Sequence, residues 1–336
     1  TLENAYRDVR IAYAAEIVRY CDKQNIDFFG LRDAVNERIS QTDDASASAT
    51  AVPSGGILVP TVGVGGHCLP KDGILLWWRR IESGFDTSNS LIIRSREIND
   101  ESPAHTIWLA EQAFGDISGR QVALLGTAYR FDSEETRNSP TLDLATQLLD
   151  KKVTIKIHDP YVKPDDQNLE RRDLQPYFTN DLGEAMTGAD IAIICTGHGV
   201  YQKGLHEMLG AGDKLTGIVD GANVFRTEDF ADTDVVYTGI GRGSEVPSAD
   251  FTSFVEESFK AVEHGVANEV AALIEFLNTN FAAGEFNLVK LDEVRELAGS
   301  CVTGCDIAQT LDAVAAPEYR GFTSRLAMCA ANAVDP

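Results

Sequence analysis

The sequence of 336 residues has few lysines and no basic stripe. Lysine supplies 10 of its 29 basic residues, against 52 Asp and Glu, and the formal net charge is −23. Acidic side chains are spread along the whole chain, and such a surface repels the phosphates of nucleic acids, which excludes a nucleic-acid partner. Because salt screens repulsion between like charges, we expect a halophilic protein.

Long apolar runs and a dense set of cysteines are also missing. No stretch of about 18 apolar residues could cross a bilayer, and the opening TLENAYRDVR is too polar for a secretory signal, so we expect a cytoplasmic protein with no membrane partner. The six cysteines are too sparse for a disulfide framework, and we expect them to be reduced. They are Cys21, Cys68, Cys195, Cys301, Cys305 and Cys329.

The first third of the chain shows the helical spacing of apolar residues. This period predicts a helix over residues 2–21, which begins without a preceding capping residue, so we expect the sequence to start inside that element. FGLRDAVNERI predicts a second helix, and QTDDASASATAVPSGG, residues 41–56, predicts a loop. Between Gly73 and Phe114 the pattern predicts more helices, among them a long central one typical of a dimer contact.

From Gly119 onwards short apolar runs alternate with helical patterns. RQVALLG, VTIKIHDP, ADIAIICTG and GIVDGAN predict strands, and PTLDLATQLLDKK predicts a helix. This alternation indicates a parallel, doubly wound, Rossmann-like sheet over residues 119–243, with its ligand at the carboxyl ends of the strands. We therefore expect an α/β chain with a helical part (1–118), the sheet (119–243) and a tail of unknown role (244–336), whose FTSFVEESFKAV and ANEVAALIEFLNTNF predict helices.

The dinucleotide fingerprint G-x-G-x-x-G is absent from the sequence. The segment after the first predicted strand, LLGTAYRFDSEETR, has one glycine, and Tyr129 and Arg130 follow where the fingerprint needs small residues. We do not expect this sheet to be the main cofactor-binding half.

Cys68 lies in GVGGHCLPKDGILL, between a glycine-rich approach and a predicted helix. A cysteine acts as a nucleophile only as the thiolate, and the positive end of a helix starting at Leu69 would favour that anion. Asp72, one turn further on, could position or deprotonate a water that hydrolyses a thioester. The alternative is a small, buried, apolar cysteine beside a glycine turn.

GVGGHCLPKD, together with LENAYRDVRIAYAAE, SREINDESP, LLGTAYRFDSEETRNSPTLDLATQLL and IKIHDPYV, resembles the UDP-glucose/GDP-mannose dehydrogenase family over about residues 1–243. The GGHC form is more similar to the UDP-N-acetylhexosamine dehydrogenases than to the UDP-glucose enzymes. The resemblance implies a homodimer in which NAD oxidises C6 of a UDP-sugar twice, most simply UDP-N-acetylmannosamine. A thiohemiacetal and then a thioester form on the cysteine, and water releases the uronate.

The resemblance also implies roles for individual residues. Cys68 matches the nucleophile, Asp72 the carboxylate that handles the water, and Asn4 the amide that helps to hold the developing oxyanion. Arg137 matches an arginine that reaches NAD bound by another domain. For each arginine the alternative is a solvated surface charge. The residues implied to contact the nucleotide sugar are Tyr6, Gly65, Gly66, Arg130 and Arg242.

The sequence departs from the family in several places. The NAD-binding domain is not in these 336 residues and the family's catalytic lysine would precede Thr1, so we expect the chain to be inactive alone. No Lys or Arg lies between Arg38 and Lys71, where the family has a loop arginine that crosses to the partner subunit's substrate. Arg10 and Ala15 stand where asparagines are common.

The sequence leaves other functions open for the chain. The chain could act as a UDP-glucose 6-dehydrogenase, as a non-catalytic nucleotide-sugar-binding or dimerisation module, or as a thiol hydrolase pairing Cys68 with His67. His198, in CTGHGVY, could contact substrate or be a loop histidine without a special role.

Two further groups of side chains are expected to pack against other side chains and not to form a site. Cys301 and Cys305 are four residues apart but lack further ligands, so we expect packing and no metal site. An apolar stripe in the tail predicts core or an interface and consists of Phe251, Phe254, Phe259 and Val262.

Overall fold

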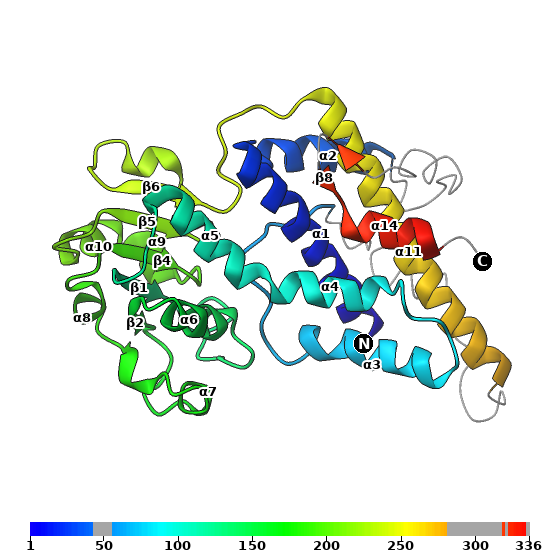
Figure 1. Cartoon of the computed structure of the whole chain (residues 1–336), viewed down its shortest axis with the longest axis horizontal. Helices are drawn as coiled ribbons and strands as arrows, with labels where there is room; N and C mark the ends of the chain where they lie inside the picture. Colours follow the sequence, from blue (N-terminus) through cyan, green and yellow to red (C-terminus); the bar gives the residue numbers. More distant parts are fainter. Residues whose placement is uncertain (43–55, 281–317, 320–321, 334–336) are drawn as a thin grey trace. The chain divides into compact units, whose positions relative to one another are not determined.

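The computed structural model describes residues 1–42, 56–280, 318–319 and 322–333. Its contacts divide the chain into two compact units, drawn together in Figure 1. The first comprises Thr1–Val59, Cys68–Ile98 and Gly243–Pro336, and the second comprises Pro60–His67 and Asn99–Arg242. The α/β class is confirmed, whereas the division at 118/119 and 243/244 stays a prediction. Most of the predicted loop 41–56, and Cys301 and Cys305, lie outside the described residues.

The first unit is helical. Buried Val9, Tyr13 and Ile17 confirm the predicted spacing in its first helix, which ends at Asn25 in the left-handed conformation, φ 56°. A two-stranded antiparallel pair, β7 (Glu318–Tyr319) and β8 (Phe322–Thr323), accompanies the helices. The helices are α1 (Leu2–Gln24), α2 (Phe28–Thr42), α3 (Leu69–Glu82), α4 (Leu91–Asp100), α11 (Ala249–Asn280) and α14 (Arg325–Ala333).

The two helices predicted in the tail are one helix, α11, which runs without interruption through Gly265. A β-carbon at Gly265 would lie 2.5 Å from Leu91 Cδ1 and 2.8 Å from Ala330 Cβ. The glycine therefore permits a close approach of neighbouring helices and does not end the helix. Phe251, Phe259 and Val262 are buried, so the predicted apolar stripe is core at these positions.

Two buried carboxylates bind the tail helices to the rest of the first unit. Glu16 of α1 accepts hydrogen bonds from Ser324 Oγ (2.8 Å) and the Arg325 amide (2.7 Å) at the start of α14, while burial raises the pKa of Glu16. A carboxylate is favourable there because the first amides of a helix lack partners and carry partial positive charge.

Glu269 of α11 does the same for α4. It accepts hydrogen bonds from Ser90 Oγ (2.5 Å) and the Leu91 amide (2.9 Å), and it pairs with Arg80 Nη1 of α3 at 2.7 Å. One side chain from the tail thus joins three helices, and the described tail residues are part of the first unit's core.

The second unit contains a six-stranded, all-parallel sheet in the order β3-β2-β1-β4-β5-β6. Four strands were predicted, namely β1 (Gln121–Leu125), β2 (Thr154–His158), β4 (Ile191–Ile194) and β5 (Gly217–Asp220). Two strands were not predicted. They are β3 (Phe178–Thr179), which has two residues, and β6 (Val236–Gly239), an edge strand that begins with an exposed valine. This strand order confirms the Rossmann-like fold.

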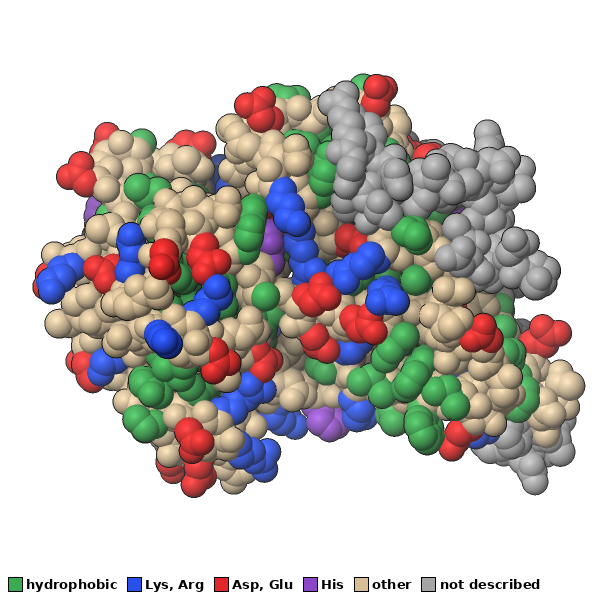
Figure 2. All heavy atoms as spheres, viewed as in Figure 1, with side chains coloured by type: hydrophobic (Ala, Val, Ile, Leu, Met, Phe, Trp, Pro, Cys, Tyr) green, Lys and Arg blue, Asp and Glu red, His purple; other side chains and the backbone are tan. Residues whose placement is uncertain are grey.

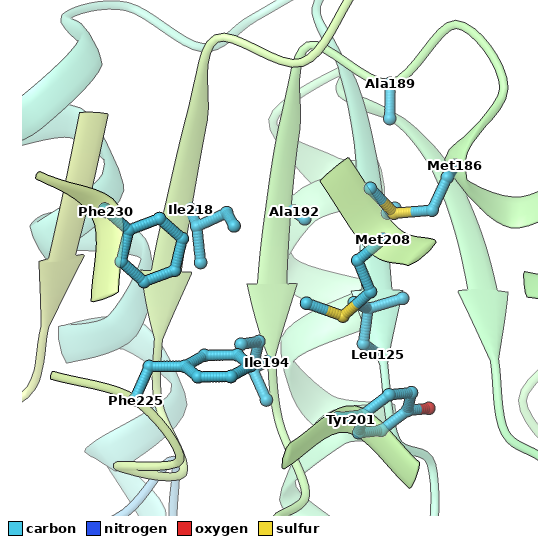
Figure 3. Packing of buried hydrophobic residues seen from close by; sticks show 11 residues of the cluster. Leu125, Met186, Ala189, Ala192, Ile194, Tyr201, Met208, Ile218, Phe225 and Phe230 are labelled. Atoms are coloured by element: carbon cyan, nitrogen blue, oxygen red, sulfur yellow. The ribbon is translucent and has the colours of Figure 1, made fainter. Parts of the chain in front are cut away.

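Helices cover the sheet of the second unit. Strand residues Leu125, Ile194 and Ile218 pack against Met208 and Tyr201 from the helical side, as Figure 3 shows. The helices are α5 (Ser102–Phe114), α6 (Pro140–Asp150), α7 (Gln167–Glu170), α8 (Leu182–Met186), α9 (Gly199–Lys203) and α10 (Leu205–Ala211).

The predicted long central helix is interrupted once, because a single residue, Glu101, separates α4 from α5. Pro103 lies in the first turn of α5. Its ring nitrogen carries no hydrogen to donate to the carbonyl four residues earlier, which ends the series of helical hydrogen bonds.

Four of the six cysteines lie in the described residues. Cys21, Cys68, Cys195 and Cys329 are free thiols. Within residues 1–42, 56–280 and the two short C-terminal segments, no helix is long and apolar enough to span a bilayer. Acidic side chains are scattered over the face drawn in Figure 2, and the halophilic character stays a prediction.

Replacing Glu269 by alanine is expected to lower the free energy of unfolding by about 3–5 kcal/mol, because Arg80 keeps a buried charge without its partner and the start of α4 loses its acceptor. Urea unfolding followed by circular dichroism measures this. Glu275, exposed on the same helix, provides the matched control, and Glu275→Ala is expected to change the value by no more than about 0.5 kcal/mol. Equal midpoints for the two variants would contradict the assignment.

Candidate active site

Cys68 lies at the amino end of α3, directly before its first residue. Its backbone is already helical (φ −85°, ψ −56°), its carbonyl accepts from the Asp72 amide at 2.8 Å, and Pro70 occupies the first turn. The side chain is exposed, whereas Cys21, Cys195 and Cys329 are buried. The alternative of a buried apolar cysteine is therefore wrong, and a negative charge on the sulfur would lie at the positive end of a helix.

Asp72 lies one turn after Cys68, and its carboxylate is buried against α1. Asn4 Nδ2 donates to Asp72 Oδ2 at 2.7 Å, and Lys71 Nζ lies 3.1 Å from Asp72 Oδ1. The next residue, Gly73, allows this approach, because a β-carbon there would lie 2.9 Å from Ile92 Cγ2 and 3.8 Å from Ala5 Cβ.

The hydrogen bond from Asn4 lowers the pKa of Asp72, and the nearby Lys71 adds to the effect, whereas burial opposes it. Asp72 is therefore ionised at neutral pH and can accept a proton from water. Asn4 uses one of its two amide hydrogens on Asp72, so the second remains for another acceptor. The first unit thus brings together all three residues predicted to be catalytic, although their roles stay predictions.

Tyr6, predicted to contact the ligand, is 8% exposed. Its hydroxyl donates to Glu263 of α11, 257 positions later in the chain, and the Arg10 guanidinium carbon lies 5.6 Å from the centre of its ring. This contact joins α1 to the tail helix. A contact of Tyr6 with a ligand stays a prediction.

Gly65 and Gly66 belong to the second unit and pack against the loop after β1. A β-carbon on Gly65 would lie 2.4 Å from Tyr129 Cβ, and Gly66 has φ +91°, which favours glycine. Gly66 donates its amide to the Arg137 carbonyl (2.8 Å) and accepts from Asn138 Nδ2 (2.9 Å). The two glycines therefore have a packing reason, and their predicted contact with a nucleotide sugar stays untested.

The three predicted arginines lie in the second unit in different environments. Arg130 is exposed on the loop after β1. Arg137, also exposed, donates from Nε to Glu135 at 2.9 Å. Arg242 is half-buried and donates from Nη2 to the Phe225 carbonyl at 3.0 Å, so it is not a solvated surface charge. Their roles toward phosphate, sugar and NAD stay predictions.

A polar network at the carboxyl edge of the sheet was not predicted from the sequence. His198, 0% exposed, lies 3.1 Å from Asp159 through Nε2, and its Nδ1 accepts the Asp132 amide at 2.8 Å. Two signals were available: His198 after one predicted strand, where it could contact substrate, and an acidic residue directly after another, in IHDP. Sequence spacing could not pair the two, which are 39 positions apart.

The loop after β1 does not fit a dinucleotide pyrophosphate. Gly126 has φ +99°, but a β-carbon there would meet Thr196, and the bulky Tyr129 follows three residues later. The close backbone approach made by the second and third glycines of the fingerprint is missing. Within the part of the chain that the structure describes, no group of three or more His, Cys, Asp or Glu could hold a metal ion.

The Asn4–Asp72 hydrogen bond should make the stability of the fold depend on pH. Asn4→Ala is expected to raise the pKa of Asp72, because the largest influence holding it down is removed. A carboxylate with a depressed pKa stabilises the fold above its unfolded value of about 3.9, and this contribution is lost as the pH falls through the folded pKa. The variant should therefore be less stable than the parent at pH 7, and the difference should shrink below about pH 4.

Carbon-13 NMR titration of the aspartate carboxyl groups, with urea unfolding at both pH values, measures these two effects. Glu3→Ala, an exposed neighbour on the same turn, is the control and should leave the Asp72 titration unchanged. An Asp72 titration identical in parent and Asn4→Ala protein would show that the hydrogen bond does not control this carboxylate.

Comparison with known proteins finds two matching domains. Residues 1–101 match the central domain of the UDP-glucose/GDP-mannose dehydrogenase family, and residues 123–227 match its UDP binding domain. A UDP-N-acetyl-D-mannosamine dehydrogenase of Pyrococcus horikoshii is 28% identical over 246 residues, which are 72% of this chain and 50% of that protein.

Two solved structures are similar to this chain. The NDP-N-acetyl-D-galactosaminuronic acid dehydrogenase of Methanosarcina mazei has a TM-score of 0.59 at 29% identity, covering 72% of this chain and 49% of that one. The UDP-D-ManNAc dehydrogenase of Pyrococcus horikoshii has a TM-score of 0.54 at 29% identity, covering 72% and 50%. The chain spans about half the length of the curated relatives it matches. On the two matched domains, the chain belongs to the UDP-glucose/GDP-mannose dehydrogenase family.

Proposed function

We propose that this chain supplies the thiol-bearing and UDP-binding parts of an NAD-dependent UDP-sugar 6-dehydrogenase that converts UDP-N-acetylmannosamine, or a related UDP-N-acetylhexosamine, to the uronate. The observation that carries the proposal is the exposed Cys68 at the start of α3, one turn from an ionised Asp72 that Asn4 holds in place. The names of the relatives support the choice of sugar.

The chain's own residues account for the covalent steps. The Cys68 thiolate adds to the C6 aldehyde, so a C–S bond forms and the carbonyl electron pair moves to oxygen, where the free Asn4 amide hydrogen can stabilise it. At the thioester stage Asp72 accepts a proton from water, the water oxygen bonds to C6, and the C–S bond breaks to release the thiolate. A thiol is needed because an aldehyde carbon cannot lose a hydride until a nucleophile makes it tetrahedral.

The cofactor is assigned to a site outside the described sheet. NAD is implied by the family, but the loop after β1 does not fit its pyrophosphate. The sheet instead suits the UDP half of the substrate, since ligands bind at the carboxyl ends of such strands and residues 123–227 match the UDP binding domain. Arg130, Arg137 and Arg242 are the proposed cations for phosphate and cofactor.

A non-catalytic nucleotide-sugar-binding module is the second candidate. The observations that favour it are the missing dinucleotide fingerprint and the absence of Lys or Arg between Arg38 and Lys71, where a loop arginine was expected. A UDP-glucose 6-dehydrogenase and a thiol hydrolase using His67 remain further alternatives.

Alkylation of Cys68 tests the proposal directly. Iodoacetamide near neutral pH is expected to label Cys68 ahead of the buried Cys21, Cys195 and Cys329, because burial raises the pKa of each of those thiols, that of Cys195 to about 12. UDP-N-acetylmannosamine at ten times its Kd is expected to slow labelling of Cys68 about tenfold, because only the free protein reacts.

Peptide mapping by mass spectrometry measures the labelling at each of the six cysteines, and ADP serves as the control nucleotide. UDP-glucose protecting at lower concentration than UDP-N-acetylmannosamine would favour the UDP-glucose alternative. Slow labelling of Cys68, with no protection by any UDP-sugar, would support the non-catalytic module.

The proposed assembly is a homodimer through the helices of the first unit. Its support is an apolar stripe on α3, seen as a green patch over that helix in Figure 2. Four large side chains on successive turns of α3 are exposed there, at 38–55% each, and such a contiguous patch indicates an interaction site. They are Ile74, Leu75, Trp78 and Ile81.

Trp78→Glu is expected to convert the dimer to a monomer, because the substitution places a charge in the apolar stripe, and light scattering after size exclusion measures the mass. Val246→Glu is the matched control, since Val246 is an exposed apolar residue outside α3 and its change should leave the mass unaltered. A monomeric parent protein, or a Trp78→Glu variant that remains dimeric, would count against this interface.

A further inference from the structure

We infer that His198 and Asp159 are positioning residues for the nucleotide site, which fix the loop of residues 126–139 that carries Arg130 and Arg137. The inference rests on the proposed function for the identity of the ligand, a uridine diphosphate group. Asp159 lies in the motif IKIHDPYV, but the family resemblance implied a role for neither Asp159 nor His198, and both lie outside the group formed by Cys68, Asp72 and Asn4.

The strand order places this pair at the ligand-binding crevice of the fold. After β1 the chain proceeds to β2 and β3 on one side, and it then returns to β4 on the other side of β1. The loops after β1 and β4 therefore diverge, and ligands of doubly wound sheets bind in the crevice that this divergence opens. His198 follows β4, and Asp159 follows β2.

Asp159 holds the start of the loop. It is 0% exposed, and its Oδ2 accepts the amides of Thr127 (2.7 Å) and Ala128 (2.9 Å). Its Oδ1 accepts the amides of Tyr161 (2.9 Å) and Val162 (3.1 Å). Although burial raises the pKa of Asp159, the hydrogen bonds from His198 and the backbone outweigh it and the pKa is lowered, so the group is a carboxylate with every partner a donor.

His198 holds the middle of the loop through Nδ1 and contacts Asp159 through Nε2. A backbone amide can only donate, so Nδ1, which accepts the Asp132 amide at 2.8 Å, carries no proton, and Nε2–H donates to Asp159 at 3.1 Å. Asp132 has a left-handed backbone (φ 51°), and its Oδ1 accepts the amide of Gly199 (2.9 Å) and the hydroxyl of Tyr161 (3.2 Å).

The fixed turn at Asp132 lies two residues after Arg130. A diphosphate is bound best by guanidinium groups already held in place, because ordering a flexible loop on binding costs entropy that weakens affinity. Tyr129 and Asn138 of the same loop contact Gly65 and Gly66. Gly66 lies two residues before Cys68 in the sequence. The pair therefore determines the path of the loop from the β1 end to the glycine segment.

Two substitutions of His198 separate its two hydrogen bonds. In His198→Asn the side-chain oxygen takes the place of Nδ1 and can still accept the Asp132 amide, so the Kd for UDP should stay within about threefold of the parent. In His198→Gln the amide nitrogen takes the place of Nε2 and keeps the bond to Asp159, but the Asp132 amide loses its acceptor, and the Kd should rise about tenfold. Isothermal titration of the full chain measures both.

A double-substitution cycle with Arg130→Ala distinguishes positioning from general stability. If His198 acts through the loop arginines, His198→Gln should weaken UDP binding less in the Arg130→Ala background than in the parent. Uridine, which lacks phosphates, should bind parent and His198→Gln protein equally. Equal, additive losses in both backgrounds, or an equal loss for uridine, would overturn the positioning role.

Tyr161→Phe provides a milder variant should His198→Gln fail to fold. It removes only the hydroxyl that donates to Asp132, on the exposed side of the network, and should raise the Kd for UDP two- to threefold with no change for uridine. An unaltered Kd for UDP in every one of these variants that folds would overturn this inference and leave the proposed function standing. A parent chain that does not bind UDP would overturn both.

Discussion

The arrangement of the second unit's ligand edge depends on one carboxylate, Asp159. The loops that follow parallel strands contain backbone amides without partners in the sheet, and each buried amide without an acceptor costs free energy. Asp159 accepts four such amides, two from the segment after β1 and two from the segment after β2. One buried carboxylate therefore satisfies the backbone of both loops and holds them together.

The first unit applies the same physical principle at helix ends. Glu16 and Glu269 each place a buried carboxylate against the opening amides of another helix, α14 and α4 respectively. The chain has a net charge of −23, and most of its acidic side chains can remain in solvent. Burying a carboxylate costs free energy unless it is hydrogen-bonded or paired, so the few that are buried need specific donors. These donors come from distant parts of the sequence, which makes the tail helices structural members of the unit that carries Cys68.

The sequence was sufficient where a pattern is local. Apolar runs predicted β1, β2, β4 and β5, and helical spacing with the cysteine motif predicted that Cys68 would precede a helix with Asp72 one turn later. It failed where the cause is distant. The two-residue β3 pairs only with β2. The tail was predicted as two helices, because the close neighbours of Gly265 in the single helix α11, Leu91 and Ala330, are remote in sequence. The pairing of His198 with Asp159 has the same origin.

The uninterrupted course of α11 restricts how this region can change by insertion or deletion. Glu263 bonds to α1, Gly265 packs closely against α4 and α14, and Glu269 contacts α3 and α4. Each contact depends on the angular position of its residue around one helix. One added residue among them would turn everything beyond it by about 100° and advance it about 1.5 Å. Length variation among relatives that carry this helix should therefore be confined to its ends, while the stretch from Glu263 to Glu269 keeps a constant number of residues.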